Sequence, residues 1–494
     1  MAIQIDENQL SKLVEAVVAQ MTGNNGVNSQ NKINYAPVIP STNNTGNSVV
    51  SHSRFSEGIF ATVDEAVAAA KKAYNEFSSV PLEKRKVFIK AMREAAVTNA
   101  EIFAQETVTE SGFGRVSDKI QKILLAANKT PGTEDLSPLC YTGDDGLTLV
   151  EPAPFGVIGS ITPVTNPTPT VINNGIGMVA AGNAVVFNPH PSARNVSNHA
   201  VSVLNRAIAK AGGPKTLLCS IASPTLETSA ALMKHPDIRI LMVTGGGAVV
   251  KSAMTSGKRC IAAGPGNPPV IVDDTADVSH AAKCIVNGAS FDNNVLCTAE
   301  KEVFVFDSIA DSLVSEMQKN GAYLLNSTQT EAITKVMVEP GEPWPHPNKK
   351  YVGHNASELL ATIGISVSDS VRLVICEVPD DSHPLVQTEM LMPILPIVRV
   401  QDLNEALDKA KKAEHFFRHS AYMHSENVNN MSLVARAIET TIFVKNAPSY
   451  AGLGFGGEGF TTLSIAGPTG EGLTSARTFT RQRRCVLAGA FRIV

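Results

Sequence analysis

The chain has 494 residues, which is long for one hydrophobic core and predicts two or three domains. Hydrophobic residues make up 43% and charged residues 18%, proportions that are ordinary for a globular protein, and the formal net charge is −4. Acids and bases are mixed along most of the sequence. The basic footprint of a nucleic-acid-binding protein is therefore absent, and that class is excluded.

The cysteines indicate a compartment. They are scattered and odd in number, and no two form a C-x-x-C pair; the seven positions are 140, 219, 260, 284, 297, 376 and 485. This pattern argues against a disulfide framework or a zinc site, so we expect no metal, and it favours the reducing cytoplasm. The first residues are polar and acidic without a basic stretch, so we expect no secretory signal peptide.

The N-terminal segment is expected to be a unit of its own. Its apolar residues recur at helical spacing and predict an amphipathic helix over residues 1–21; they are Leu10, Leu13, Val14, Val17, Val18 and Met21. Residues 22–50 are rich in Asn, Ser, Thr and Gly and predict a disordered linker. A tethered helix is either a fraying terminus or a docking peptide, and the regular apolar stripe favours docking.

From about residue 58 the pattern becomes that of a globular α/β domain. Thr62 and Glu65 predict a capping box before the helix "VDEAVAAAKKAYNEF", and a second helix is expected over residues 82–105. "FGVIGSITP", "NAVVFNPHP" and "IRILMVT" are typical of buried strands, each followed by a helical pattern. Short strands that alternate with helices predict a doubly wound parallel sheet.

A long run without charges supports this interpretation. No Asp, Glu, Lys or Arg occurs in residues 152–193, but prolines and asparagines interrupt the run, so no membrane-spanning stretch remains. Strands covered on both faces lose their charges in the same way. The run therefore predicts the buried interior of the sheet domain.

A doubly wound sheet binds its ligand at the carboxyl ends of its strands. "ITPVTNP", "FNPHP" and "VTGGG" follow predicted strands, and the last precedes a helix whose N-terminus attracts phosphate. The candidate cofactor-binding residues at these ends are Thr162, Pro163, Asn188, Pro189, His190, Gly245, Gly246 and Val249. A formal G-x-G-x-x-G at Gly454, Gly456 and Gly459 is followed by no helix and is interpreted as a loop.

Cys297 lies in "SFDNNVLCTAEKEV", between a small polar turn and a predicted strand. Most free cysteines behave as small buried hydrophobic residues. A cysteine on a loop can instead be a nucleophile that its surroundings activate. The neighbouring residues leave both interpretations open.

Several motifs occur together in the order found in the aldehyde dehydrogenases, and the sequence resembles that superfamily over roughly residues 55–494. They are "PFGVIGSITPVTNP", "VTGGGAVV", "SFDNNVLCTAEK", "TEMLMPILPIV" and "FVKNAPSYAGLGFGGEGF". "AAGPGNPPVIVD", "PTGEGLTSARTF" and "RRCVLAGAFRIV" are similar to the coenzyme A-acylating branch associated with bacterial microcompartments, the acetaldehyde and propionaldehyde dehydrogenases. The resemblance implies an α/β fold with a doubly wound parallel-sheet cofactor domain, an α/β catalytic domain and a β oligomerisation arm.

The resemblance also gives a plan of the domains. After the helix and linker, the expected order is: cofactor domain in 51–138 and 151–262, catalytic domain in 263–445, return to the cofactor domain in 446–473, and oligomerisation arm in 139–150 and 474–494. Such an arm adds strands to a neighbour's sheet and implies a dimer or a tetramer.

The roles of individual residues follow from the same resemblance. In the family, the cysteine at the Cys297 position attacks the aldehyde, and the thiohemiacetal gives hydride to NAD and becomes a thioester. Asn166 and the backbone N–H of Cys297 are expected to hold the oxyanion. Glu389 is expected to contact the nicotinamide ribose. His419 is expected either to polarise the substrate or to take the proton of the coenzyme A thiol.

Each of these residues has an ordinary structural interpretation as well. Taken alone, Asn166 is typical of a turn before proline, Glu389 of an exposed loop carboxylate and His419 of a buried structural histidine. Ser420 stands where the branch carries threonine after the histidine, which is a mild departure.

Two other departures bear on the reaction. Hydrolysing relatives carry a glutamate base at the position of Ala262, and neither Ala262 nor the adjacent Ala263 accepts a proton. A thioester without that base is expected to wait for another nucleophile, the coenzyme A thiol. Asn188 stands where many relatives carry lysine, which removes an anchor for a 2′-phosphate and favours NAD over NADP.

The sequence therefore predicts an NAD-dependent, coenzyme A-acylating dehydrogenase of acetaldehyde or propionaldehyde, inside a bacterial microcompartment in the cytoplasm. Residues 1–21 are expected to bind a shell or lumen protein, and neither nucleic acid nor membrane is expected as a partner. The alternatives are a dehydrogenase that releases free acid and an inactive protein that packs the shell lumen. One methylene changes specificity by only about 1–3 kcal/mol, so the aldehyde itself stays open.

Overall fold

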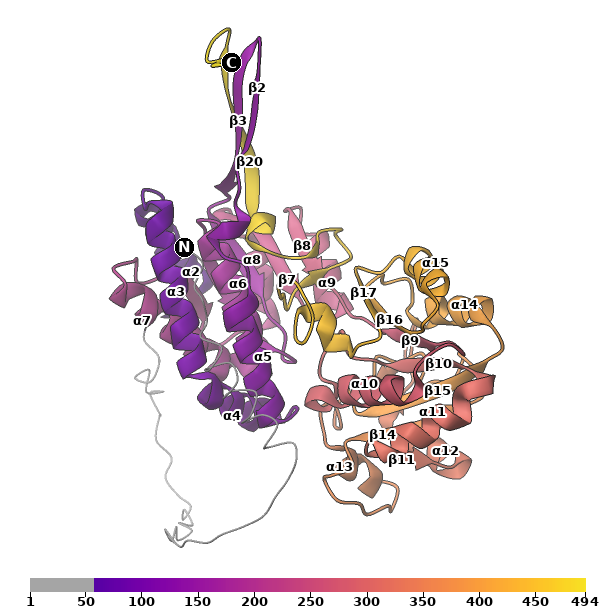
Figure 1. Cartoon of the computed structure of the whole chain (residues 1–494). Coiled ribbons are helices and arrows are strands. Elements are labelled where there is room, and N and C mark those ends of the chain that lie inside the picture. Colours follow the sequence, from indigo (N-terminus) through magenta and orange to yellow (C-terminus); the bar gives the residue numbers. More distant parts are fainter. Residues whose placement is uncertain (1–56) are drawn as a thin grey trace, which may run out of the picture. The chain divides into compact units, whose positions relative to one another are not determined.

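The computed structural model describes residues 57–494. The helix predicted over residues 1–21 and the linker predicted over 22–50 lie outside the described residues. The described part contains two large parallel sheets covered by helices, a three-stranded antiparallel sheet and two short strand pairs (Figure 1).

The first sheet has six parallel strands in the order β1-β6-β5-β4-β7-β8. The strands are β1 (Ile59–Phe60), β4 (Val157–Ile161), β5 (Ala184–Asn188), β6 (Leu218–Ile221), β7 (Ile238–Thr244) and β8 (Cys260–Ala263). Every residue of β4 and β5 is buried, which explains why the sequence carries no charge there. The predicted doubly wound parallel sheet is thus confirmed.

Helices cover both faces of this sheet. They are α2 (Val63–Phe77), α3 (Leu82–Thr98), α4 (Ala100–Ser111), α5 (Val116–Lys129), α6 (Pro167–Ala180), α7 (Arg194–Lys210), α8 (Leu226–Lys234) and α9 (Gly247–Met254). The chain winds outward from β4 to β6 through α6 and α7 and then crosses back through α8 to β7. Because parallel crossovers are right-handed, α6 and α7 lie on one face and α8 on the other.

The start of α2 agrees with its sequence, whereas the next helix does not. The capping box of Thr62 and Glu65 is present, with both reciprocal hydrogen bonds. The single helix predicted over 82–105 is wrong, because α3 ends at Thr98 and α4 begins at Ala100. Between them the side chain of Asn99 donates to the carbonyl of Ala95, a local bond that competes with helix continuation.

The second sheet has seven parallel strands in the order β11-β14-β15-β10-β9-β16-β17. They are β9 (Pro269–Val272), β10 (Glu302–Phe306), β11 (Ala322–Leu325), β14 (Leu373–Val378), β15 (Ile394–Val400), β16 (Ser420–His424) and β17 (Ile442–Lys445). Side chains alternate between two cores: Val303 and Val305 of β10 join one, and Phe304 joins the other.

Helices follow the strands of this sheet too. They are α10 (Val278–Ser290), α11 (Asp307–Lys319), α12 (Ser327–Met337), α13 (Ala356–Ala361), α14 (Leu403–Ala413) and α15 (Val428–Ile438). The first core packs on α10 and α11, and the second packs on α12, α13 and α14. Both faces of the sheet are therefore buried, as in the first sheet.

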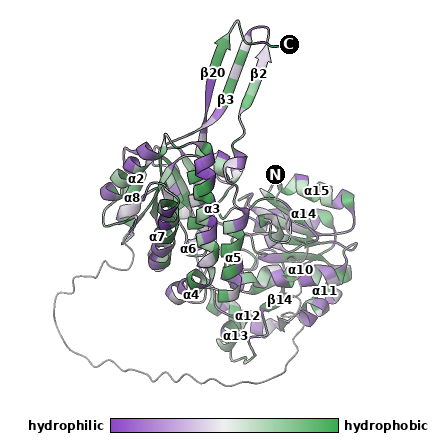
Figure 2. Cartoon of the chain, turned by 60° about the vertical axis from the view of Figure 1, so that its left-hand side comes forward, coloured by the Kyte–Doolittle hydropathy of each residue, from purple (hydrophilic) through white to green (hydrophobic). Residues whose placement is uncertain are grey.

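The remaining elements are short, apart from one antiparallel sheet. Short 3₁₀ turns and strand pairs are η1 (Thr133–Asp135), η2 (Pro191–Ala193), η3 (Phe291–Asn294), η4 (Ser449–Leu453), η5 (Ala476–Phe479), β12 (Val338–Glu339), β13 (His346–Pro347), β18 (Ile465–Ala466) and β19 (Gly472–Leu473). β2 (Leu139–Gly143), β3 (Gly146–Pro154) and β20 (Thr480–Ala488) form an antiparallel sheet that projects from the first sheet region (Figures 1 and 2).

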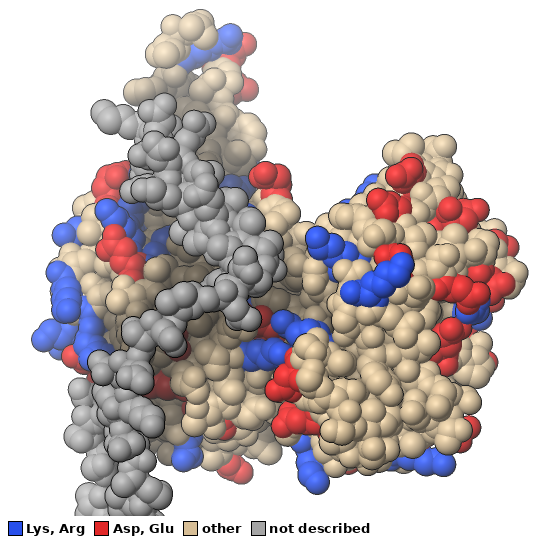
Figure 3. Space-filling model, turned by 60° about the horizontal axis from the view of Figure 1, so that its bottom comes forward, with Lys and Arg blue, Asp and Glu red and all other residues tan. Residues whose placement is uncertain are grey.

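Two observations concern helix length and the distribution of surface charge. Within residues 57–494, no helix has both the length and the apolar character that a membrane crossing requires. Acidic and basic side chains are interspersed over the face shown in Figure 3, and no large area of one sign forms there.

Candidate active site

The first sheet has a topological switch point between β4 and β7. From β4 the chain winds toward β5 and β6, and it returns on the other side of β4 with β7 and β8. Ligands bind in the crevice at the carboxyl ends of strands at such a point. Thr162 and Pro163 follow β4 there, and Gly245 and Gly246 follow β7. These residues, predicted from the sequence to bind the cofactor, therefore lie at this crevice.

Thr162 and the glycines leave room and hydrogen-bonding capacity at this edge. The buried hydroxyl of Thr162 has no partner among the described residues. A Cβ at Gly245 would meet Val249 Cγ1 at 2.9 Å, so this glycine lets the turn approach its own helix closely. A Cβ at Gly246 would meet nothing within 4 Å, so the turn opens onto free space before the N-terminus of α9.

The strand end at Asn188 is more occupied. Asn188 is buried; its Nδ2 donates to Ser229 Oγ at 2.8 Å, and its Oδ1 accepts from Thr228 Oγ1 at 2.7 Å. His190, beyond Pro189, is exposed, and its Nδ1 accepts from the backbone N–H of Ser192. Burial of the ring and the charge of Lys349 lower the pKa of His190.

The second sheet presents the opposite ends of its strands. Glu389, Cys297, Gly266 and His419 lie shortly before β15, β10, β9 and β16, which are neighbours in the sheet in that order. Because the strands are parallel, these four residues gather at one edge, the amino edge. The structure thus brings together Cys297, Glu389 and His419, which are far apart in the sequence.

The loop before Cys297 has an unusual backbone. Asp292, Asn293 and Asn294 all adopt left-handed conformations, with φ of 49°, 54° and 65°. Asp and Asn tolerate this region better than other residues with a Cβ. Each side chain is anchored: Asp292 accepts from the N–H of Arg115 at 2.8 Å, Asn293 Oδ1 accepts from Arg115 Nε at 2.8 Å, and Asn294 Nδ2 donates to the carbonyl of Ala289 at 2.8 Å.

Cys297 is partly exposed on the turn that follows this loop. Burial of its sulphur and the nearby carboxylate of Glu389 raise the pKa of the thiol to about 12, while Lys301 and Lys122 act in the opposite direction. Within the described residues, the backbone N–H of Cys297 makes no hydrogen bond to another residue. A donor without a partner beside the sulphur is available to a substrate oxygen.

Asn166 stands at the N-cap position of α6, and Pro167 is the first residue of that helix. Its Oδ1 accepts from Lys122 Nζ at 2.6 Å, and Lys122 also donates to the carbonyl of Val295 at 2.7 Å. A buried lysine of α5 therefore joins Asn166, at the end of the first sheet, to the Cys297 loop.

Gly266 is the point where the other site residues meet. Its N–H donates to Glu389 Oε1 at 3.4 Å. A Cβ at this position would lie 2.8 Å from His419 Cγ and 2.9 Å from the carbonyl oxygen of Cys297. Burial raises the pKa of Glu389 to about 7, and the charge of Lys301 opposes that rise.

His419 is buried and held in one orientation. Its backbone N–H donates to Glu414 Oε1 at 2.7 Å, and its Nδ1 lies 2.8 Å from Ser420 Oγ. Its Nε2 is buried and has no partner among the described residues. Burial, and then the charge of Lys301, lower the pKa of the imidazole to about 4, so at neutral pH the ring is uncharged and can accept a proton.

Comparisons with known proteins agree with this geometry. The model of the Aldehyde dehydrogenase family matches residues 35–337. The acetaldehyde dehydrogenase (acetylating) EutE of Salmonella typhimurium is 51% identical over 442 residues, which cover 88% of this chain and 94% of that protein. This chain belongs to the aldehyde dehydrogenase family.

Two solved structures from the family share the fold. The propionaldehyde dehydrogenase from the fucose utilisation bacterial microcompartment of Clostridium phytofermentans is 48% identical, with a TM-score of 0.87 over 89% of this chain and 100% of that one. The propionaldehyde dehydrogenase of Rhodopseudomonas palustris, solved with bound CoA and an acylated cysteine, is 47% identical, with a TM-score of 0.86 over 89% of this chain and 100% of that one. The aldehyde dehydrogenase-like fold is thus confirmed.

The position that hydrolysing family members use for a base has no acid here. Ala262 is buried in β8, and its N–H donates to Thr469 Oγ1 at 3.0 Å. Its methyl group cannot activate water. Among the described residues no group of three His, Cys, Asp or Glu is arranged to hold a metal ion.

A small cavity of about 10 Å³ lies beside Leu296, the residue before Cys297. Leu296 lines it together with residues of α5 and with the aromatic side chains of Phe291, Tyr450 and Phe455. The three rings pack on one another at centroid distances of 5.1–6.1 Å. This volume has room for about one water molecule, so the rings would have to move to admit an aldehyde chain.

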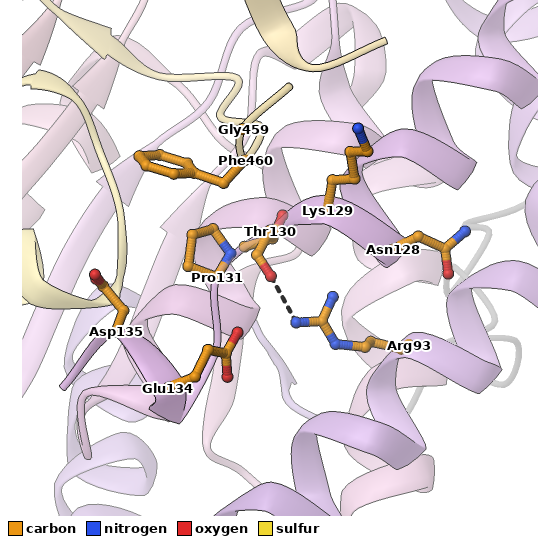
Figure 4. A pocket seen from close by; sticks show the side chains of 9 residues that line it. All are labelled: Arg93, Asn128, Lys129, Thr130, Pro131, Glu134, Asp135, Gly459 and Phe460. Atoms are coloured by element: carbon orange, nitrogen blue, oxygen red, sulfur yellow. Dashed lines mark hydrogen bonds between the residues drawn. The ribbon is translucent and has the colours of Figure 1, made fainter. Parts of the chain in front are cut away.

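A second cavity lies elsewhere. It has a volume of about 390 Å³ and is lined by Arg93, Lys129, Glu134 and Phe460, among others (Figure 4). Arg93 already donates to the carbonyls of Ala127 and Thr130, so its guanidinium is used to hold the end of α5. Gly459 of the formal G-x-G-x-x-G lines this cavity in a loop, as its sequence context indicated.

Several site residues were not found from the sequence. Lys122 and Lys301 are buried lysines, and a lysine in isolation is more typical of a solvated surface. Gly266 and Asn267 stand within "AAGPGNPPVIVD"; Asn267 Nδ2 donates to the carbonyls of Val386 and Ala413 and so joins the segments before Glu389 and His419. Gly266 in the segment "PGNP" was the available signal, but the residues that lie close to it in space come from distant segments of the sequence.

Proposed function

We propose that this protein oxidises a short-chain aldehyde with NAD and coenzyme A to an acyl-coenzyme A and NADH. The observation that carries the proposal is that the chain has the candidate nucleophile Cys297 but has Ala262 at the position where hydrolysing relatives carry a base. Its similarity to an acetylating acetaldehyde dehydrogenase, and to a propionaldehyde dehydrogenase solved with bound CoA and an acylated cysteine, supports it.

In the first half-reaction Cys297 Sγ attacks the aldehyde carbon, and the carbonyl oxygen becomes an oxyanion. Asn166 Nδ2 and the Cys297 N–H donate to that oxygen; such donors contribute roughly 3–4 kcal/mol to lowering a barrier. The carbon then gives hydride to the nicotinamide, which leaves NADH and a thioester on Cys297. No water is consumed in this half-reaction.

Activation of the thiol is needed because its pKa is raised to about 12 in the free protein. Glu389, whose own pKa is raised to about 7, lies beside it, and its charged carboxylate opposes formation of the thiolate. The positive charge of bound NAD would act in the same direction as Lys301 and stabilise the thiolate.

In the second half-reaction the sulphur of coenzyme A attacks the thioester carbon, and Cys297 leaves as a thiolate. Within residues 57–494 the buried Nε2 of His419 has no hydrogen-bond partner, so it is the proposed acceptor of the coenzyme A proton. Ser420 Oγ on Nδ1 fixes the ring for this role, as the threonine of relatives would.

The cofactor is proposed to be NAD, held at the carboxyl edge of the first sheet by the Thr162, Asn188 and Gly245 turns and by Glu389. Asn188 offers no positive charge to a 2′-phosphate, and its amide is bonded to Thr228 and Ser229. Acetaldehyde and propionaldehyde both fit this proposal, and rates with a series of aldehydes of increasing length would rank them.

Dependence on coenzyme A tests the proposed reaction. Without coenzyme A the protein should give at most one equivalent of NADH per site and then stop as an acyl-enzyme; with coenzyme A it should turn over. Steady formation of free acid without coenzyme A would favour a hydrolytic dehydrogenase. No NADH under either condition would favour an inactive packing protein.

We further propose that the protein works inside a bacterial microcompartment, which is where the name of the Clostridium phytofermentans relative places that protein. We also propose that it assembles through its antiparallel sheet. Strands β2 and β20 leave exposed edges that can pair with a neighbour, giving a dimer or a tetramer. Residues 1–21 are proposed to dock on a shell or lumen protein. Deleting them, or Leu13→Asp or Val17→Asp, should release the protein from shells without changing its kinetics, and sedimentation with shells measures this.

A further inference from the structure

Lys122 has an environment that the reaction described above does not use. Its side chain is buried, and its ammonium group has three partners: Asn166 Oδ1 at 2.6 Å, the carbonyl of Val295 at 2.7 Å and Asp292 Oδ2 at 2.5 Å. An ammonium has three protons and accepts no hydrogen bond, so these contacts use its whole capacity.

The contact with Asn166 decides how that amide is turned. Since Lys122 can only donate, it must face the oxygen of Asn166, and the nitrogen must point the other way. Nδ2 has only a long contact of 3.4 Å, to Thr165 Oγ1. The amide N–H groups are therefore left for a ligand.

The contact with Val295 adds a second constraint. Val295 lies two residues before Cys297, on the same turn, and Asn166 lies at the start of α6. One ammonium thus fixes the separation between Asn166 and the Cys297 turn. These are the two places from which the proposed oxyanion donors come.

We propose that Lys122 is a positioning residue for the oxyanion site: it orients the Asn166 amide and ties it to the Cys297 turn. The proposal rests on the proposed function, in which Asn166 Nδ2 and the Cys297 N–H hold the oxyanion. Burial lowers the pKa of Lys122 to about 8 and the neighbouring Asp292 opposes this, so at neutral pH the ammonium is present.

Lys119 provides a matched control. It lies one turn earlier on α5, is equally buried, and pairs with the same Asp292 Oδ2 at 2.9 Å. Within residues 57–494 it makes no hydrogen bond to Asn166 or Val295. A variant at Lys119 therefore removes a buried charge from the same cluster without touching the amide.

The experiment measures the rate of the first NADH turnover in Lys122→Met, Lys119→Met, Asn166→Ala and Lys122→Met/Asn166→Ala. Lys122→Met should lower that rate about 10- to 100-fold, with little change in the KM for aldehyde, and Lys119→Met should lower it less than about threefold. In the Asn166→Ala background, Lys122→Met should lower it less than about threefold further, because the amide is already gone.

Equal effects of Lys122→Met in both backgrounds would overturn the proposal, since the lysine would then act only on the Cys297 loop. A wild type that gives no NADH with aldehyde, NAD and coenzyme A would instead refute the proposed function. If Lys122→Met does not fold, Asn166→Asp decides: it keeps an oxygen for Lys122 but lacks the N–H. It should be as slow as Asn166→Ala, and a first turnover within threefold of wild type would overturn the positioning role.

Discussion

The first sheet presents the carboxyl ends of its strands to the candidate active site, whereas the second sheet presents its amino ends. Thr162 and Gly245 follow strands β4 and β7, while Cys297 and His419 precede strands β10 and β16. The two sheets have the same parallel architecture, so the difference lies in which loops face the site.

The two edges also differ in what they offer a ligand. The first edge consists of glycine turns, prolines, a threonine and a helix N-terminus, which bind through backbone groups. The second edge carries ionisable groups withdrawn from solvent: Lys301 and Glu302 are buried, and Glu389 is half-buried. Under the proposed function, one sheet would hold the nucleotide with its main chain and the other would perform proton chemistry with side chains.

Removing the nucleophile at the second edge should have the largest effect on activity. Cys297→Ala should abolish NADH formation with every aldehyde, a loss of about 10⁴-fold or more, because no covalent intermediate forms. An absorbance assay and a thermal melt separate loss of chemistry from loss of fold. Activity above about one tenth of wild type, a barrier change of only about 1.4 kcal/mol, would assign the nucleophile to another cysteine.

Crowding the second edge should have the next largest effect. In Gly266→Ala the new Cβ would lie 2.8 Å from His419 Cγ and 2.9 Å from the Cys297 carbonyl oxygen, so the nucleophile and the histidine must move apart. A displacement of about 1 Å costs on the order of 10²-fold in rate. Gly143→Ala, in the β2–β3 hairpin with nothing within 4 Å, is the control. A kcat within threefold of wild type would contradict the geometry.

On the first edge, filling the free space should weaken binding without harming the fold. Gly246→Ala adds a methyl where nothing lies within 4 Å and where the backbone φ is −64°. We expect the KM for NAD to rise about tenfold with kcat unchanged, the effect of losing one hydrogen bond to a charged group. An unchanged KM would mean that the nucleotide does not approach this turn.

The charge of Glu389 should be visible in the reactivity of the thiol. Since its carboxylate raises the pKa of Cys297, Glu389→Gln should accelerate alkylation of Cys297 by iodoacetamide at pH 8 about three- to tenfold. Because the pKa of Glu389 is raised to about 7, the difference should fade by pH 6, where the wild-type carboxyl is largely protonated. Exposed Glu331→Gln should show no change, and slower alkylation in Glu389→Gln would reverse our sign.

The smallest effect should come from Glu302, whose two carboxyl oxygens are buried and have no hydrogen-bond partner among residues 57–494. Burial raises its pKa well above its usual range, so the folded protein keeps a proton that the unfolded chain loses above about pH 4.3. Wild-type stability therefore falls relative to Glu302→Gln as pH rises through this window. From pH 5 to pH 8 the Tm of Glu302→Gln should rise by a few degrees relative to the Tm of wild type. The Tm difference between Glu331→Gln and wild type should stay constant over the same range.

The sequence predicted the first edge better than the second. Strand, turn and helix follow one another at Ile161–Thr162 and Thr244–Gly245, so local sequence patterns predict a ligand-binding position there. The capping box at Thr62 was equally local. The break at Asn99 was missed because helical periodicity continues across it.

The second edge depends on contacts between distant segments. Lys122 and Asp292 are 170 residues apart in the chain, and neither suggests the other in the sequence. Cys297, Glu389 and His419 were found only because the motifs around them resemble a known family. Periodicity alone gave no reason to choose the amino ends of the strands.

The three left-handed residues Asp292–Asn294 have a consequence for engineering. Their backbone excludes β-branched and bulky side chains; Asp292 and Asn293 are both bonded to Arg115, and Asn294 is bonded to Ala289. Phe291 directly before them, and Tyr450 and Phe455 packed against it, have no such backbone constraint and line the small cavity beside Leu296. A library that tests whether longer aldehydes enter this cavity should therefore vary the three rings and hold the tripeptide constant, because the cavity lining and the loop geometry are encoded by separate, adjacent residues.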